Sequence, residues 1–436
     1  MPKVSLTTIG CKLNQYETEA IASGLVRRGW EKVPFSQNAD LCVINTCTVT
    51  NQADQSSRQA ISQAHRRSPQ AKIVVTGCYA QIAREQLKEL PGVGLVIGSD
   101  YKDRLPNVIE DWLAGRPEKE LESERAGTAY VEQKEFSAEN HIGHTRAFVK
   151  IQNGCQEWCS FCVIPMTRGP ERSRPLDWVV SEVESLVEKG FKEVVITGVH
   201  IGKYEWEGNE LVDLLKAILE RTQIRRIRLS SIKPREVTPE LVDLIAGEER
   251  FCRHLHLPLQ SGDKRTLERM KRKYTLEEFD SILHSFAEKI PEITLGTDVI
   301  VGFPGETEAE FASSCRYIEN SPLNFLHVFS YSDRSNTLAS EMEGKIDPVE
   351  INRRSAVLRE LGNKKWQAFM DGFAGKTLLV LVEIHRGRQN NLLTGLADNY
   401  IRVNFGGPDT CSNQIVPVRI LKREGTALFG NLTSGN

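Results

Sequence analysis

The sequence has no long apolar segment, since none of its hydrophobic runs approaches the roughly 20 residues that a membrane-spanning helix requires. It also has no secretion signal, because the N-terminal stretch MPKVSLTTIG contains neither a basic nor an apolar region. Net charge is almost absent, at −2, so the composition as a whole does not favour a nucleic-acid partner. These absences predict a cytoplasmic protein that has no membrane partner.

The chain has 436 residues, which is enough for two or three domains of roughly 100 to 200 residues each. Hydrophobic residues make up 40% and charged residues 26%, the balance of an ordinary globular protein and not of a disordered chain. Up to about residue 100, short apolar strands alternate with helix-like segments, which predicts an α/β domain with a parallel sheet.

The alternation resumes after a charged stretch, and six strand-like segments lie between Ala147 and Ser332. One intervening helix is expected to stop at Gly190, and another to start with Thr238 as N-cap and Pro239 as first helical residue. This succession predicts a TIM-like barrel or a doubly wound sheet. The last 60 or so residues carry strand-like pieces between Gly and Asn turns, which predicts a small antiparallel β-barrel. The expected division is residues 1–115, a linker at 116–142, a central domain at 143–374 and a C-terminal barrel at 375–436.

Ten cysteines are the most informative feature of the composition, because a reducing cytoplasm argues against structural disulfides and favours metal binding. Cys155, Cys159 and Cys162 lie on one loop directly after the first strand of the central domain. Their spacing differs from the paired knuckles of zinc ribbons, and no fourth Cys or His follows at a zinc-like distance. Three thiolates fit an iron-sulfur cluster that leaves one iron open to another ligand, although a zinc or adventitious site stays as the alternative.

This cysteine pattern, with Phe161 directly before Cys162, resembles the signature of radical S-adenosylmethionine (SAM) enzymes. The resemblance implies a 4Fe-4S cluster whose open iron binds SAM, and a partial (β/α)6 barrel with the site at the carboxyl ends of its strands. It also implies that polar residues on the loops after the strands contact the cofactor, although each could instead cap a segment or support the core. Besides Phe161, these candidates are Gly198, His200, Ser230, Ser231, His256 and Asp298.

A second set of cysteines, Cys11, Cys47 and Cys78, occurs in the N-terminal domain, and each residue follows a predicted strand. The carboxyl ends of parallel strands meet at one edge of a sheet, so we expect the three thiols to converge. Cys42 lies within a strand and is expected to be a small buried residue. The same interpretation applies to Cys252, Cys315 and Cys411.

The three parts together resemble the methylthiotransferases, most closely those that modify N6-threonylcarbamoyladenosine at position 37 of tRNA, and the C-terminal part resembles the RNA-binding TRAM domain. The resemblance implies a second 4Fe-4S cluster at Cys11, Cys47 and Cys78, and conversion of the adenine to its 2-methylthio derivative by radical chemistry. Met166 and Lys233 depart from the usual pattern of this group. One alternative is a methylthiotransferase whose substrate is isopentenyladenosine in tRNA or a ribosomal protein. The other is a non-catalytic RNA-binding protein that holds zinc.

The implied partners are the anticodon stem-loop of tRNA, an electron-donor protein and a sulfur source. Cations that lie close together in the sequence are the expected phosphate contacts. They are Lys264, Arg265, Lys271, Arg272, Arg386, Arg388, Lys422 and Arg423.

Overall fold

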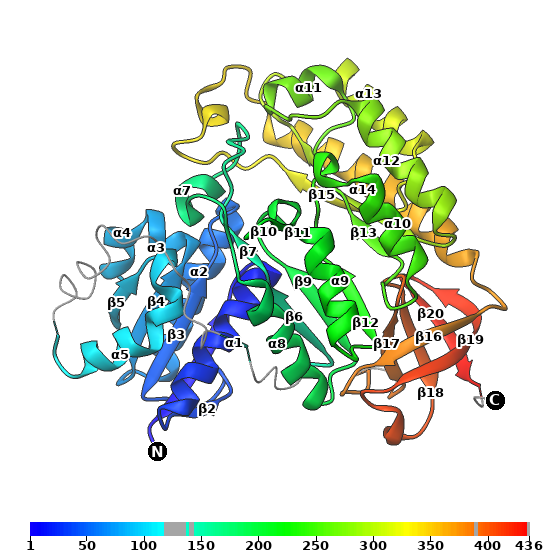
Figure 1. Ribbon diagram of the computed structural model, residues 1–436. Coiled ribbons are helices and arrows are strands. Elements are labelled where there is room, and N and C mark those ends of the chain that lie inside the picture. The colour runs from blue at the N-terminus through cyan, green and yellow to red at the C-terminus, as the bar shows by residue number, and fades with distance from the viewer. Residues whose placement is uncertain (117–136, 139–143, 388–390, 434–436) are drawn as a thin grey trace.

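A computed structural model describes residues 1–116, 137–138, 144–387 and 391–433 (Figure 1). An N-terminal α/β domain, a central domain of parallel strands and a C-terminal barrel follow one another along the chain. The predicted linker at 116–142 lies almost wholly outside the described residues. Within the described part of the chain, no helix is both long and apolar enough to cross a membrane.

The N-terminal domain contains one five-stranded sheet in the order β2-β1-β3-β4-β5, with every pairing parallel, as the sequence predicts. Apolar side chains from both faces of the sheet form two clusters under the covering helices. The strands are β1 (Lys3–Thr8), β2 (Glu31–Val33), β3 (Leu41–Thr46), β4 (Lys72–Gly77) and β5 (Val93–Ile97). The helices are α1 (Lys12–Arg27), α2 (Asn51–Arg67), α3 (Cys78–Ile82), α4 (Arg84–Lys88), the 3-10 helix η1 (Ser99–Arg104) and α5 (Leu105–Leu113).

Six parallel strands form the central domain, as predicted, in two hydrogen-bonded groups of three with the orders β12-β9-β6 and β13-β14-β15. A parallel bridge between Ile227 and Phe251 connects the groups, so β6 and β15 are the free edges of a partial barrel. The barrel interpretation is therefore confirmed over the doubly wound alternative. The strands are β6 (Arg146–Lys150), β9 (Glu193–Thr197), β12 (Arg226–Leu229), β13 (His254–His256), β14 (Thr294–Val301) and β15 (Phe325–Ser330).

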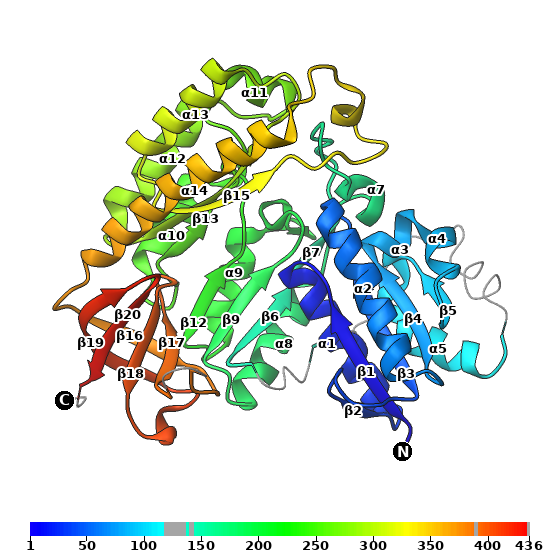
Figure 2. The same ribbon diagram turned by 180° about the vertical axis from the view of Figure 1, so that it is seen from behind.

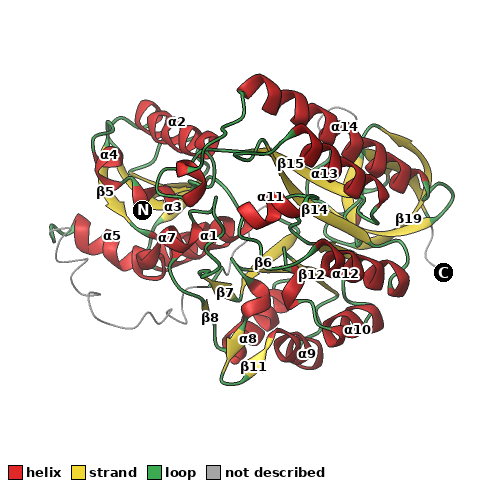
Figure 3. Cartoon of the chain, turned by 90° about the horizontal axis from the view of Figure 1, so that it is seen from above, coloured by secondary structure: helices red, strands yellow, loops and turns green. Residues whose placement is uncertain are grey.

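Helices cover the outside of these strands in an arc that is visible from above (Figure 3). Local sequence signals set their ends: Thr238 caps α10 by accepting the N–H of Leu241, and Thr275 and Glu278 form a capping box on α12. The chain leaves α8 at Gly190, whose φ of +88° suits glycine. The helices are α7 (Ile164–Arg168), α8 (Leu176–Glu188), α9 (Leu211–Arg221), α10 (Pro239–Gly247), α11 (Lys264–Arg269), α12 (Leu276–Lys289), α13 (Glu308–Asn320) and α14 (Pro348–Asp371).

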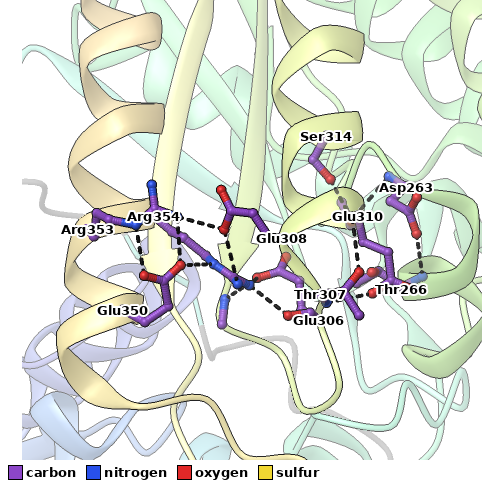
Figure 4. A network of polar contacts seen from close by, with 12 residues as sticks. Asp263, Thr266, Glu306, Thr307, Glu308, Glu310, Ser314, Glu350, Arg353 and Arg354 are labelled. Atoms are coloured by element: carbon purple, nitrogen blue, oxygen red, sulfur yellow. Dashed lines mark hydrogen bonds and ion pairs between the residues drawn. The ribbon is translucent and has the colours of Figure 1, made fainter.

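A polar network fixes α14 against the loop after β14 (Figure 4). The buried carboxylate of Glu306 accepts hydrogen bonds from the N–H of Gly302 at 2.7 Å and from Nη1 of Arg354 at 2.8 Å. Glu350 accepts from Nε of Arg354 at 2.7 Å, one helical turn away. Since α14 also packs along β15, these bonds hold the edge strand of the partial barrel in place.

The C-terminal part is a closed five-stranded barrel in the order β16-β17-β18-β20-β19, and Figure 2 shows it beside β12 at the lower left. The predicted small barrel is confirmed, but it is not purely antiparallel, because β18 and β20 pair in parallel to close it. Arg228 joins it to the central domain by donating to the carbonyl of Asp398 at 2.9 Å while it pairs with Glu193 at 2.7 Å. The strands are β16 (Thr377–Val382), β17 (Leu393–Ala397), β18 (Arg402–Gly406), β19 (Ile415–Glu424) and β20 (Ala427–Leu432).

Short elements complete the described structure. The two-residue strands are β7 (Gln152–Asn153), β8 (Arg172–Ser173), β10 (Glu205–Trp206) and β11 (Asn209–Glu210). The remaining 3-10 helices are η2 (Ile201–Lys203), η3 (Pro234–Glu236), η4 (Leu338–Glu341) and η5 (Asp409–Cys411).

Candidate active site

The loop with Cys155, Cys159 and Cys162 runs between β7 and α7, at the carboxyl end of the first barrel strand. It starts at Gly154, whose φ is +83° and where a Cβ atom would lie 1.8 Å from the carbonyl oxygen of Pro170. Backbone hydrogen bonds from Cys155 to Gly169 and from Cys162 to Cys159, both 3.0 Å, hold the loop closed. Only glycine fits at its first position, and the loop geometry is therefore fixed by backbone packing.

Cationic groups lie beside the thiol of Cys155. The Cys155 sulfur is 3.4 Å from Nζ of Lys233 and 3.8 Å from Nδ1 of His200. Burial opposes ionisation, but the hydrogen bond from His200 and the charge of Lys233 lower the pKa of Cys155. Burial raises the pKa of Cys162 to about 12. Since ligating sulfur must be deprotonated, metal or cluster binding at this loop releases protons.

Polar residues from the following strands complete the end of the partial barrel. His200, after β9, is held from both ring nitrogens, by Glu171 at 3.0 Å and by Glu236 at 2.8 Å. Burial works against protonation, but hydrogen bonds with Cys155 and Glu236 raise the pKa of His200 to about 9. Gly198 lies on the same loop, where a Cβ atom would be 2.8 Å from the carbonyl oxygen of Gln152. These residues therefore form a charged, closely packed rim near Cys155.

The serine, histidine and aspartate candidates lie on the inner side of the strands. Ser231 and Nδ1 of His256 are 2.7 Å apart, and Nε2 of His256 is 3.2 Å from Oδ1 of Asp298. Burial works against ionisation, but hydrogen bonds from His256 and His327 hold the pKa of Asp298 well below its usual range. Ser230 is buried, and its hydroxyl has no partner among the described residues.

A cavity of about 190 Å³ lies next to the cysteine loop. Phe161 and Cys162 of the cysteine loop line it, together with Asp298 and Ile300 of β14 and Phe329 of β15. Most of these walls are apolar, and the carboxylate of Asp298 supplies one polar anchor. The sequence-predicted Phe161 and Asp298 are thus brought together at a small-molecule site.

The second cysteine trio also converges, because β1, β3 and β4 are neighbours in the sheet. Cys11 is the N-cap of α1, Cys47 follows β3, and Cys78 begins α3 after β4. The thiol of Cys47 interacts electrostatically with both Cys78 and Cys11, and burial raises its pKa to about 11. Cys47 also packs against Gly10, where a Cβ atom would meet its sulfur at 2.9 Å.

A buried arginine connects the two cysteine loops. Arg168, in α7 of the central domain, donates through Nε to the sulfur of Cys78 at 3.3 Å and through Nη1 to Glu17 at 2.6 Å. Burial opposes ionisation, but the charges of Arg168 and Lys102 lower the pKa of Cys78. Arg168 and Glu17 are each 1% exposed, so this ion pair is shielded from water. The sequence does not indicate these residues, because Arg168 meets Glu17 only when the two domains dock, and Lys102 meets Glu17 only through the packing of η1 on α1.

The donor sets fit two iron-sulfur clusters, because each trio consists of thiolates. Thiolates that share one zinc ion lie within about 4 Å of each other, because each Zn–S bond is ~2.3 Å. Among the described residues, the groups of metal-ligating atoms that all lie within 4.8 Å of one another do not include either cysteine trio. They are Cys155 with Glu171 and His200, and His256 with Asp298 and His327. Each trio has the soft thiolate ligands of an iron-sulfur cluster, and its three sulfurs do not all lie within 4.8 Å of one another.

The predicted phosphate contacts lie in different surroundings. Lys264, Arg265, Lys271 and Lys422 are exposed. Arg272 is half-buried and donates to the sulfur of Cys159 at 3.4 Å, so its side chain is directed at the cysteine loop. Three cations of the C-terminal barrel are paired with carboxylates: Arg386 with Asp409 at 2.8 Å, Lys422 with Glu424 at 2.5 Å and Arg423 with Asp371 at 2.7 Å. Arg388 lies outside the described residues.

The other cysteines are buried, as predicted, with one exception. Cys42, Cys252 and Cys411 are buried. Cys315 is only partly buried, because it lies on α13 at the edge of the core.

Two parts of the sequence match models of known protein families. Residues 149–318 match the model described as the Radical SAM superfamily, and residues 3–98 match the one described as Uncharacterized protein family UPF0004. The solved structure of the radical SAM methyltransferase TsrM from Kitasatospora setae aligns with a TM-score of 0.55 and 18% identity, over 76% of this chain and 75% of that one. The central fold is thus that of the radical SAM enzymes.

Curated relatives narrow the class further. The chain is 41% identical to the threonylcarbamoyladenosine tRNA methylthiotransferase MtaB of Aquifex aeolicus over 93% of this chain and 97% of the relative. It is 37% identical to the MtaB protein of Bacillus subtilis, over 97% and 94% of the two chains. It is 32% identical to the tRNA-2-methylthio-N(6)-dimethylallyladenosine synthase of Thermodesulfovibrio yellowstonii over 99% of both.

The chain belongs to the radical SAM methylthiotransferases. It is an enzyme that transfers a sulfur-containing group, and the cofactors of its family are SAM and 4Fe-4S clusters.

Proposed function

We propose that this protein converts N6-threonylcarbamoyladenosine at position 37 of tRNA to its 2-methylthio derivative in the cytoplasm. One observation carries the proposal: two cysteine trios on neighbouring loops of two domains, joined through Arg168, next to a barrel cavity. The names of the four first relatives, at 34 to 41% identity over nearly the whole chain, support this substrate over the dimethylallyl one. An electron-donor protein and a sulfur source are the further partners of the proposed reaction.

In this proposal, Cys155, Cys159 and Cys162 hold the cluster that binds SAM, and Cys11, Cys47 and Cys78 hold a second cluster. When bound, these groups supply the radical that activates the adenine C–H bond and the sulfur that is transferred. The protein itself orients the reactants and excludes water.

The residues around each trio have defined tasks. Lys233 and His200 place positive charge beside Cys155, and Arg168 does the same beside Cys78, which favours the thiolate form of both ligands. Phe161 and Ile300 supply apolar walls to the cavity beside Cys162, against which an adenine ring would pack, and Asp298 offers its carboxylate to a hydroxyl or an amino group. The exposed Lys264, Arg265 and Lys271 remain our proposed phosphate contacts on this domain.

Mass spectrometry of tRNA nucleosides tests the proposal. Cells without the gene should accumulate N6-threonylcarbamoyladenosine and lose its 2-methylthio form, and a plasmid copy should restore it. Loss of 2-methylthio-isopentenyladenosine instead would assign the other tRNA substrate. If cells without the gene keep an unchanged nucleoside profile but contain an unmodified ribosomal protein, the substrate is that protein and not tRNA.

A further inference from the structure

A row of aromatic side chains lines the inner face of the edge strand β15. Successive residues of a strand point to opposite faces, so Phe325, His327 and Phe329 share one face. The alternate residues face α14: Ser330 Oγ lies 3.1 Å from Ser355 Oγ, and Leu326 packs against Gly362. His327 and Phe329 therefore point away from α14, toward the interior of the partial barrel, whereas Phe325, at the start of the strand, contacts Trp366 of α14 with ring centroids 5.0 Å apart.

These rings form a continuous surface between two cavities. The centroids of Phe325 and His327 are 5.0 Å apart, and those of His327 and Phe329 are 6.4 Å apart. Tyr400, from the C-terminal barrel, extends the row with its centroid 6.5 Å from that of Phe325. We call these four residues the aromatic wall. Phe329 lines the cavity beside Cys162, and Phe325 and Tyr400 line a second cavity of about 410 Å³.

Two rings of the aromatic wall are more exposed than the interior of a barrel normally is, whereas Phe325 packs against Trp366 and Tyr400 stacks on His254 with centroids 4.5 Å apart. Closed barrels fill their interior with packed aliphatic side chains, whereas the side chain of His327 is 50% exposed and Phe329 is 43% exposed. Among the described residues, no strand pairs with the outer edge of β15. Aromatic rings that are fixed in place and open to solvent are suited to stacking against flat ligands.

The second cavity adds positive charge at one end of the aromatic wall. Arg146, Arg359 and Arg402 contribute to its lining, and no carboxylate does so among the described residues. Arg146 has a carboxylate 3.6 Å away, that of Glu383. The guanidinium of Arg359 contacts the carbonyl of Val328 at 3.5 Å, and that of Arg402 contacts the hydroxyl of Thr394 at 3.4 Å. Such neutral contacts leave their charge available to an anion.

We propose that the aromatic wall binds the unpaired nucleotides next to the target base, with bases on the exposed rings of His327 and Phe329 and backbone phosphates at Arg359 and Arg402. The inference rests on the proposed function, since it names how the same RNA reaches the cavity beside Cys162. Sequence-tolerant recognition of single-stranded nucleic acid combines these two features, stacking platforms and a basic groove. A peptide ligand would gain little from a row of rings that ends in three arginines.

Binding of an anticodon stem-loop RNA to the anaerobically reconstituted holoenzyme tests this inference. The RNA carries 2-aminopurine in its loop, so stacking quenches the fluorescence, and anisotropy gives the affinity at several salt concentrations. A His327→Ala, Phe329→Ala double variant should lose the quenching. It should bind about 5- to 150-fold more weakly for each stacked base lost, with an unchanged salt slope. An Arg359→Ala, Arg402→Ala double variant should keep the quenching and flatten the slope of log K against log salt by about 0.7 per lost phosphate contact.

Two matched variants control for nonspecific effects. Val349→Ala removes an exposed apolar side chain from α14, and Arg316→Ala removes an exposed cation from α13, and both should bind RNA as the wild type does. The inference is overturned if the wild type binds and the aromatic variant retains both affinity and quenching. It is also overturned if the arginine variant keeps the wild-type salt slope. If the wild type itself does not bind the stem-loop, the proposed function fails first, and the two failures are thereby distinguished.

Discussion

Replacement of Arg168 by methionine should weaken the docking of the N-terminal domain on the barrel. The guanidinium is 1% exposed and donates at 2.6 and 3.1 Å to the two carboxylate oxygens of Glu17, which belongs to the other domain. Loss of one partner of a buried ion pair costs about 3–5 kcal/mol, because the remaining charge stays uncompensated. Lys102 also pairs with Glu17 and remains in the variant, so we expect the lower end, about 3 kcal/mol.

Urea unfolding of the cluster-free protein, followed by fluorescence and circular dichroism, measures this loss. A double-mutant cycle with Glu17→Gln should give less than the sum of the two single effects, because both variants remove the same interaction. Arg353→Met is the matched control, since Arg353 pairs with Glu350 on the exposed face of α14 and should give no measurable change. The reasoning is refuted if Arg168→Met is as stable as this control, or if the cycle is additive.

Three further outcomes are expected. The pKa of Glu17 is held well below its usual range, against the effect of burial, by Arg168 and Lys102. The stability that this carboxylate adds should therefore be fully present above pH ~5, begin to decline near the unfolded pKa of ~4.3 and be lost as pH falls through the lower folded pKa; a Glu17→Gln variant with the same acid dependence would contradict this. Gly154→Ala should lower the total iron content of the reconstituted protein by about half, because a Cβ atom would lie 1.8 Å from the carbonyl oxygen of Pro170 and distort the loop that holds one of the two clusters; full iron content would count against the assignment. Thr238→Ala should lower thermal stability by about 1 kcal/mol through loss of the α10 N-cap, with RNA affinity as the unaffected control; an unchanged melting temperature would speak against the cap.

The cysteine trios could be predicted from the sequence because their positions depend on short-range rules. Cys11, Cys47 and Cys78 each follow a strand, and parallel strands bring their carboxyl ends together whatever the rest of the fold does. Six central strands were predictable for the same reason, from alternation of strand and helix. The parallel closure of the C-terminal barrel could not be predicted, since β18 pairs with β20, and β19 lies between them in the chain.

Contacts that depend on docking or on local backbone direction could not be predicted. Arg168 follows the cysteine loop in an ordinary-looking stretch, and only the position of α1 brings Glu17 to it. Arg272 belongs to a basic segment that suggests an open surface, but Lys271 has a φ of +55°, and the next side chain reaches Cys159. The strand at Phe325 was predictable, whereas the face that stays open depends on where α14 packs.

Iron and acid-labile sulfide in the anaerobically reconstituted protein test the central claim most directly. We expect about eight irons and eight sulfides per chain, falling to about four of each when Cys11, Cys47 and Cys78 are replaced by alanine. About four irons in the wild type with no loss in that variant, or zinc without sulfide, would contradict the account.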